Sequence, residues 1–266
     1  MNPVIITACA NESWLWPSDS PAAGGEQGGL DLHALIEESV RCKDAGAAVM
    51  HIHTEGLWAE SIEGIRSKSD VLIQCGMSTL AKGPRMAVFE NKSEMISIML
   101  AHHDEAFANV QNHELHPREE LVDYAKVCRE YGVKPECEIW HSGSIWNLNY
   151  LKDRGYLDEP VITTLFFGWP GGTWSPPTVE EYLYRRKLMP PGCVSSVSVM
   201  GEHQREVHTI AVQMGDHLRV GTEDWPFNRK GERATTSELV AEAAELIELL
   251  GRRVATVAEA REMMGL

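Results

Sequence analysis

Short apolar runs alternate with longer amphipathic stretches along almost the whole of this 266-residue chain. The runs have the length of strands, and the stretches have the periodicity of helices. Runs such as 161–167 are apolar on both faces, which is typical of parallel strands between a packed interior and a layer of helices. Strands are predicted at 3–9, 47–53, 70–76, 105–109, 134–140, 160–168, 194–200 and 217–221, and helices at 31–45, 60–67, 85–102, 117–131, 143–153, 178–186, 204–214 and 237–250.

Eight strand–helix units of this size predict an α/β protein with a single (β/α)8 (TIM) barrel. The length would also fit two smaller domains, but no linker divides the chain, so we predict one catalytic domain over residues 1–266. A doubly wound open sheet is the alternative fold. Its dinucleotide-binding form is disfavoured because no Gly-x-Gly-x-x-Gly follows the first strand. Asp31 and Gly46 are predicted to cap the first helix at its two ends.

Two histidines, His51 and His53, close the second predicted strand. Residues i and i+2 of a strand point to the same face, so both imidazoles project from one strand end. This arrangement suits two nitrogen ligands on one metal ion. A pair of polar residues at the edge of a loop is the alternative interpretation.

An acidic pair, Glu223-Asp224, follows the eighth predicted strand in the segment Arg219-Val-Gly-Thr-Glu-Asp. In a closed barrel, strands eight and two both flank strand one, about 10 Å apart. His51, His53 and Glu223 can then converge at the C-terminal mouth, where barrel enzymes carry their active sites. We therefore predict a catalytic metal site of two histidines and one carboxylate, with Zn2+ as the default and another divalent metal ion as the alternative.

Asp224 is the candidate general base of this predicted site. In an extended backbone it points away from Glu223, so one carboxylate binds the metal while the other faces a substrate proton. Arg219 can orient that carboxylate or pair with a carboxylate of the substrate. A structural salt bridge between Arg219 and Glu223 is the alternative.

Candidate substrate-binding residues lie at the ends of other predicted strands. Gly171 and Gly172 let a ligand approach the backbone and offer amide donors, although a tight turn explains them equally well. Glu136 and Glu138 share one face of the fifth strand, where we expect at least one carboxylate to be buried and paired. The remaining candidates are Glu12, Ser78 and Asn109.

Acidic residues outnumber basic ones, 39 to 24, which gives a formal net charge of −15. This excess disfavours a nucleic-acid or anionic-membrane surface. Lys82 with Arg85, and Arg229 with Lys230, are candidate basic patches for a phosphate-bearing cofactor. The six cysteines include no C-x-x-C pair, so we expect reduced core thiols in a cytoplasmic protein. We expect neither a signal peptide nor a membrane span.

These motifs, in this order, resemble the β-keto acid cleavage enzyme family (3-keto-5-aminohexanoate cleavage enzyme-like). The similar segments are 5–8, 45–53, 135–140, 142–143, 168–172 and 219–224, which span nearly the whole chain. The resemblance implies a metal-dependent (β/α)8 barrel, usually a homotetramer. It implies an acyltransferase that condenses a β-keto acid with acetyl-CoA to give acetoacetate and a new acyl-CoA by Claisen and retro-Claisen steps.

The resemblance also implies individual roles. His51, His53 and Glu223 match the zinc ligands of the family. Asp224 matches the base that removes a C2 proton, and Arg219 matches its partner.

Several positions depart from the family pattern. Cys75-Gly-Met-Ser78 replaces a Ser-Thr-Gly-Gly-like run, Asn109 ends a segment that lacks the family's threonine, Glu12 stands two positions early, and His141 stands where glutamate is expected. All of these positions belong to the substrate shell, so we expect the same reaction on a different substrate. Alternative functions are a metal-dependent aldolase or hydrolase of a small carboxylate without CoA, and a non-catalytic ligand-binding barrel.

Overall fold

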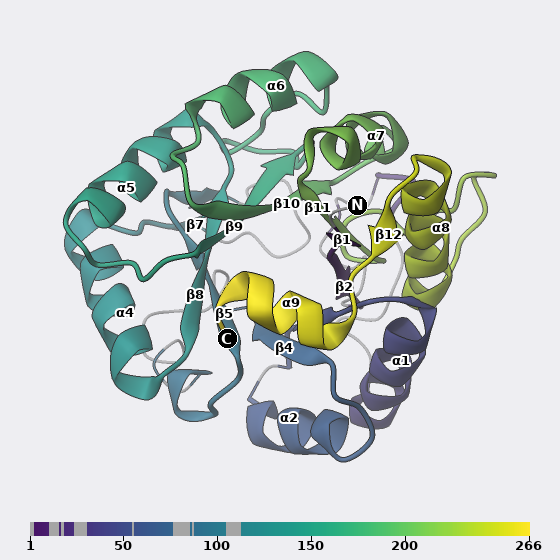
Figure 1. Cartoon of the computed structure of the whole chain (residues 1–266), viewed down its shortest axis with the longest axis horizontal. Coiled ribbons are helices and arrows are strands. Elements are labelled where there is room, and N and C mark those ends of the chain that lie inside the picture. Colours follow the sequence, from purple (N-terminus) through teal and green to yellow (C-terminus); the bar gives the residue numbers. More distant parts are fainter. Residues whose placement is uncertain are drawn as a thin grey trace.

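The computed structural model describes residues 3–10, 16, 19–23, 31–54, 56–76, 86, 88–104 and 113–266. Eight parallel strands form a closed barrel inside a ring of helices (Figure 1), so the predicted (β/α)8 fold is confirmed. In barrel order the strands are β10 (Cys193–Val199), β11 (His217–Val220), β2 (Ile6–Cys9), β3 (Val49–Ile52), β4 (Leu72–Cys75), β5 (Met95–Met99), β8 (Lys134–Ile139) and β9 (Val161–Phe167).

Seven described helices of the ring follow predicted ranges closely. They are α1 (Leu32–Ala45), α2 (Trp58–Arg66), α4 (Arg118–Tyr131), α5 (Ser142–Asp153), α6 (Val179–Leu188), α7 (Gln204–Met214) and α8 (Thr236–Leu249). Asp31 Oδ1 accepts a hydrogen bond from Ala34 N at 2.8 Å, and Gly46 ends α1 in the left-handed conformation, as predicted. Within the part of the chain that the structure describes, no helix has the length and apolar character needed to cross a bilayer.

The predicted position of the fourth barrel strand was wrong. We expected a helix over 85–102 and a strand over 105–109, but the strand that pairs with β4 and β8 is Met95–Met99. All five of its residues are buried, and Ile96 and Ile98 suit a pleated surface, so strand pairing overrides the helical preference of methionine. In the described part of the expected helix, helical residues are Met86 and 88–90. Residues 105–109 lie outside the described part of the chain.

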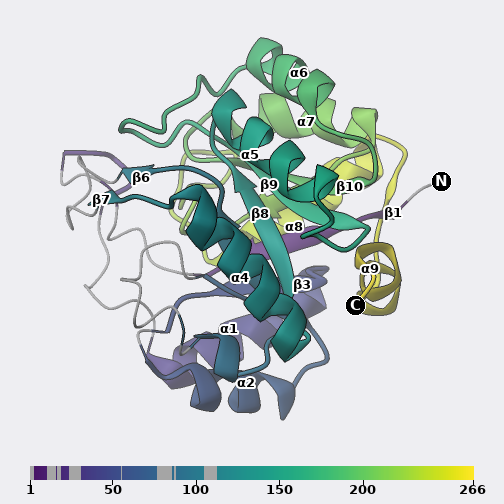
Figure 2. The ribbon, with the colours of Figure 1, turned by 90° about the vertical axis from the view of Figure 1, so that its left-hand side faces the viewer.

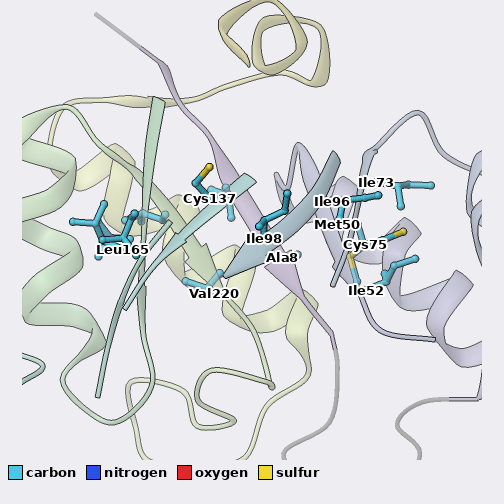
Figure 3. Packing of buried hydrophobic residues seen from close by; sticks show 14 of the residues in the cluster. Ala8, Met50, Ile52, Ile73, Cys75, Ile96, Ile98, Cys137, Leu165 and Val220 are labelled. Atoms are coloured by element: carbon cyan, nitrogen blue, oxygen red, sulfur yellow. The ribbon is translucent and has the colours of Figure 1, made fainter. Parts of the chain in front are cut away.

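Each barrel strand alternates between two environments. One set of side chains, including Met50, Ile52, Ile73 and Cys75 on β3 and β4, belongs to the main hydrophobic core between the barrel and its helices (Figure 3). The other set points into the barrel. At the N-terminal end this inner set is apolar and packs against Ala260 and Met264.

The two ends of the barrel are closed differently. Helix α9 (Val257–Met264), which was not predicted from the sequence, crosses the N-terminal end of the barrel (Figure 1). Beside it, β1 (Pro3–Val4) pairs with β12 (Arg253–Val254). The hairpin of β6 (His103–Asp104) and β7 (His113–Glu114) lies at the opposite end (Figure 2). Helix α9 covers the N-terminal end of the barrel, where the inner side chains are apolar. The polar inner side chains lie further along the strands, toward the C-terminal mouth.

Candidate active site

The structure brings His51, His53 and Glu223 together at the C-terminal mouth. Strand β2 pairs with β11 on one side and with β3 on the other, which is the predicted order. His51 Nε2 and His53 Nε2 are 3.0 Å apart, and each lies 3.8–3.9 Å from a carboxylate oxygen of Glu223. All three ligand atoms lie within 4.8 Å of one another.

The geometry of these three side chains fits a divalent metal ion. Donor atoms bound at about 2.0–2.2 Å in a tetrahedral arrangement would lie roughly 3.4 Å apart, close to the separations observed. Glu223 Oε2 is buried and has no hydrogen-bond partner among the described residues. A buried carboxylate oxygen without a partner is costly, and a cation between the three groups would remove that cost.

The surroundings of the two histidines also favour metal binding. His51 Nδ1 lies 3.2 Å from Gln74 Oε1, so the Nδ1–H donates to the amide and the Nε2 lone pair faces His53 and Glu223. Burial, together with nearby Arg219, lowers the pKa of His51 well below its usual value and keeps the ring neutral. The position of the His53 ring requires glycine at 76, because a Cβ at that position would overlap the imidazole.

Arg219 holds both carboxylates of the acidic pair. Its Nη2 donates to Glu223 Oε1 at 2.6 Å and to Asp224 Oδ1 at 3.0 Å, and its Nε donates to Asp224 Oδ1 at 3.2 Å. The backbone turns here instead of continuing extended, as Asp224 N donates to Gly221 O. Our expectation that the two carboxylates point apart assumed an extended backbone, and that condition is not met here. Gly221, at φ +155°, permits this turn, because a Cβ there would overlap the carbonyl oxygen of Cys9.

The two carboxylates differ in proton affinity. Burial opposes ionisation of Glu223, but Arg219 and the two histidines outweigh it and lower the pKa of Glu223 to about 2. Burial raises the pKa of Asp224 above its usual value; Arg219 offsets this only in part, and the charge of Glu223 adds to it. Glu223 is thus suited to remain an anionic ligand, and Asp224 is suited to accept a proton.

Two further contacts at the site were not predicted from the sequence. Ser198 Oγ donates to Asp224 Oδ2 at 2.7 Å, and Trp16 Nε1 donates to the backbone carbonyl of Glu223 at 3.2 Å. The serines at 196 and 198 alternate with valines in β10, and this alternation could have indicated that Ser198 faces the barrel interior. Trp16 lies in the first loop, where no periodicity indicates which residue turns inward.

Aromatic side chains surround the polar site at the mouth. Trp140 stacks on Phe166 with ring centroids 4.3 Å apart, and Trp16 meets Trp169 edge to face at 5.2 Å. These residues form one buried cluster with Met99 and Met200. Such a cluster lowers the local dielectric and strengthens the charge interactions beside it.

Glu136 and Glu138 both face the barrel interior. Glu138 Oε2 accepts a hydrogen bond from Trp140 Nε1 at 3.0 Å, so the expected buried, paired carboxylate is present. Glu136 is 2% exposed, and neither of its carboxyl oxygens has a hydrogen-bond partner among the described residues. Burial and the neighbouring Glu138 raise the pKa of Glu136 to about 8. Burial and the neighbouring charge therefore favour the neutral, protonated form of Glu136 over the carboxylate.

Replacing Glu136 with glutamine should flatten the pH dependence of stability. An unfolded glutamate loses its proton near pH 4.3 and the folded one near pH 8, so between these values the folded state holds one proton more. The free energy of unfolding then falls as pH rises, by up to about 1.4 kcal/mol per pH unit. Urea unfolding of both proteins at pH 5.5 and 7.5 measures the difference. Equal pH slopes in the two proteins would contradict the assignment.

The remaining predicted residues are placed as follows. Glu12, Ser78 and Asn109 lie outside the described residues. Gly171 and Gly172 form part of a tight turn after β9, in which Trp174 N donates to Gly171 O at 3.1 Å. His141 precedes α5 and caps it, accepting a hydrogen bond from Gly143 N at Nδ1.

Comparisons with known proteins agree with this architecture. A family model described as beta-keto acid cleavage enzyme matches residues 3–266. The chain is 28% identical to a 3-keto-5-aminohexanoate cleavage enzyme of Fusobacterium nucleatum subsp. nucleatum, with 100% of this chain and 99% of that protein covered. It is 23% identical to a 3-oxoadipate:acetyl-CoA acetyltransferase of Cupriavidus necator, with 99% and 95% covered.

A solved structure also has this fold. The binary complex of ObcA with oxaloacetate superposes with a TM-score of 0.74 at 18% identity. The match covers 88% of this chain and 66% of the ObcA chain, so this chain spans about two thirds of the length of ObcA.

Proposed function

Because the chain belongs to the β-keto acid cleavage enzyme family, we propose that it converts a β-keto acid and acetyl-CoA into acetoacetate and a new acyl-CoA. The observation that carries this proposal is the convergence of His51, His53 and Glu223 beside Asp224, a second carboxylate held by Arg219. The name of the Cupriavidus necator relative, 3-oxoadipate:acetyl-CoA acetyltransferase, supports acetyl-CoA as the co-substrate.

In this proposal Asp224 removes a proton from C2 of the β-keto acid. The resulting carbanion attacks the carbonyl carbon of the acetyl thioester, a C–C bond forms, and the CoA thiolate leaves. The thiolate then attacks the original keto carbon, and the bond from that carbon to C2 breaks. C2 regains a proton, and the products are acetoacetate and the new acyl-CoA. Arg219 and Ser198 hold the Asp224 carboxylate in place for the proton transfers.

His51, His53 and Glu223 are proposed to hold a divalent metal ion, zinc in the first instance, because two neutral imidazoles and one carboxylate suit that ion. When bound, it supplies Lewis-acid polarisation of the substrate carbonyl and thereby acidifies C2. The backbone amides of Gly171 and Gly172, with Glu12, Ser78 and Asn109, remain the proposed substrate-binding groups.

Gln74→Leu should weaken metal binding by about 10- to 100-fold, because the partner that fixes the His51 tautomer is lost. Competition between the protein and a chromogenic chelator for Zn2+ measures the affinity. Gln204→Leu is the matched control, since Gln204 donates to the Val199 carbonyl and has no contact with the three ligands. Unchanged affinity in Gln74→Leu would contradict the proposed role of Gln74.

The reaction itself is tested with metal-loaded protein, acetyl-CoA and a broad panel of β-keto acids. Acetoacetate should appear with at least one panel member and should disappear when acetyl-CoA is omitted. Turnover that persists without acetyl-CoA would instead show an aldolase or hydrolase acting on a small carboxylate. No turnover with any member would reject the proposed function.

We also propose a cellular compartment and an oligomeric state for this protein. Six free cysteines, of which five are buried, support a reducing, cytoplasmic setting. We propose a homo-oligomer, a tetramer by resemblance to the family, in which each chain is one catalytic domain over residues 1–266.

A further inference from the structure

A cavity of about 520 Å3 lies outside the barrel wall, between α7 and α8. These helices are neighbours in the ring (Figure 1), and Trp225, Phe227 and Asn228 of the loop that follows β11 also line the cavity. Small-molecule sites usually measure about 300–1,000 Å3, so the space can hold an extended organic ligand. The cavity is distinct from the site of His51, His53 and Glu223, none of which lines it.

Three polar side chains of α7 line this cavity, namely Gln204, Arg205 and His208. The Gln204 amide donates to the Val199 carbonyl, and the other two side chains can bind a ligand. His208 is 3% exposed; its Nε2 donates to the Val197 carbonyl at 3.1 Å, and burial lowers its pKa to about 4. The ring is therefore neutral, and its Nδ1 is a hydrogen-bond acceptor. Arg205 is exposed in the first turn of α7, and no ion pair joins its guanidinium to another described residue. The positive end of the helix dipole reinforces this charge.

The other lining residues indicate which further chemical groups a ligand of this cavity would carry. Arg229 is already neutralised, because Glu245 lies 2.7 Å and Glu242 3.6 Å from its guanidinium. Leu239 and Ala243 of α8 contribute an apolar wall. These features suit a ligand with an apolar middle, an amide N–H donor for His208 and an anionic group for Arg205.

The cavity shares a loop with the active site. Trp225 lines the cavity and directly follows Asp224. The Trp225 ring lies 5.8 Å from that of Trp16, whose Nε1 donates to the Glu223 carbonyl. The loops after barrel strands seven and eight, here β10 and β11, are also where (β/α)8 barrels frequently bind phosphate groups.

On the basis of the proposed function, we propose that this cavity binds the pantetheine arm and the diphosphate of the CoA thioester. An amide of the arm donates to His208 Nδ1, its dimethyl segment packs beside Leu239 and Ala243, and the diphosphate lies against Arg205. The thioester end passes Trp225 to reach Asp224. The Arg229–Lys230 patch, expected from the sequence to bind phosphate, has no such role in this arrangement, because Arg229 is paired with glutamates.

Two variants and a matched control test this assignment. Arg205→Glu should raise KM for acetyl-CoA by about tenfold, the size expected for loss of a charge-assisted contact. It should leave kcat unchanged, together with KM for the acetyl thioester of N-acetylcysteamine, which lacks the phosphates. Ala243→Phe fills the cavity from the opposite wall and should also raise KM for acetyl-CoA. Arg118→Glu is the control, an exposed arginine in the first turn of α4.

The outcomes separate this assignment from the proposed function. If the wild type forms acetoacetate and neither cavity variant changes KM for acetyl-CoA, the cavity assignment is overturned while the reaction stands. If the wild type forms no acetoacetate, the reaction is rejected, and calorimetric titration with CoA decides the cavity alone. Binding that is weakened in Arg205→Glu and kept in Arg118→Glu supports the assignment; equal binding in both, or none in the wild type, overturns it.

Discussion

Asp224→Asn should lower kcat for acetoacetate formation by about 10²- to 10⁴-fold, the usual contribution of a general base. The substitution keeps the shape of the side chain. The amide oxygen can still accept from Arg219, and the amide nitrogen can donate to Ser198 Oγ, so the fold should be retained. The expected loss therefore reports on proton removal and not on unfolding.

Exchange of the C2 protons in D2O, followed by NMR without acetyl-CoA, measures this step directly. It should be slow in Asp224→Asn and unaffected in Asp216→Asn, a mostly buried aspartate that binds Tyr182 and Arg186 away from the mouth. Because burial raises the pKa of Asp224, kcat/KM of the wild type should fall as pH drops through that raised value. Normal C2 exchange in Asp224→Asn would exclude Asp224 as the base.

Arg219→Met should destabilise the metal-free protein by about 3–5 kcal/mol, the usual effect of removing one partner from a buried ion pair. Arg219 is 2% exposed and is the shared donor for Glu223 and Asp224, so both carboxylates would remain buried without their cation. Chemical denaturation at pH 8 measures the loss in the free energy of unfolding.

The pH dependence of that loss identifies its cause. Without Arg219 the pKa of both carboxyl groups rises, so their protonation at pH 5 should recover part of the stability. Arg185→Met is the control, because this buried arginine donates mainly to the backbone carbonyls of Ile139 and Phe166, which do not titrate. The carboxylate with which it forms an ion pair, Glu181, is partly exposed, so water can solvate it once the arginine is gone. The same recovery in both variants would contradict an ion-pair origin.

The strand order explains why the site could be predicted from the sequence. In a closed barrel the last strand neighbours the first, so Glu223 after β11 and His51 on β3 had to approach across β2. The capping of α1 by Asp31 and Gly46 was equally predictable, because each depends on a few adjacent residues. Such features follow from periodicity and local chemistry.

Other features depend on tertiary contacts that no local pattern shows. The five residues of β5 are too few to establish a period, and pairing with β4 and β8 makes them a strand. Helix α9 is placed by burial of Ala260 and Met264 against the barrel end, although its own sequence is that of an ordinary short helix. The sharing of Arg219 by two carboxylates required the turn at Gly221, whose direction the sequence does not specify.

Metal content is the measurement that tests the central claim most directly. After zinc loading and dialysis, elemental analysis of the wild type should find about one divalent ion per chain, as expected for a single three-ligand site. His51→Ala and Glu223→Gln should each lose the ion, while His33→Ala, which alters an exposed histidine of α1, should keep it. A wild type without a stoichiometric ion, or variants of His51 and Glu223 that retain one, would contradict the claim that these side chains form a metal site.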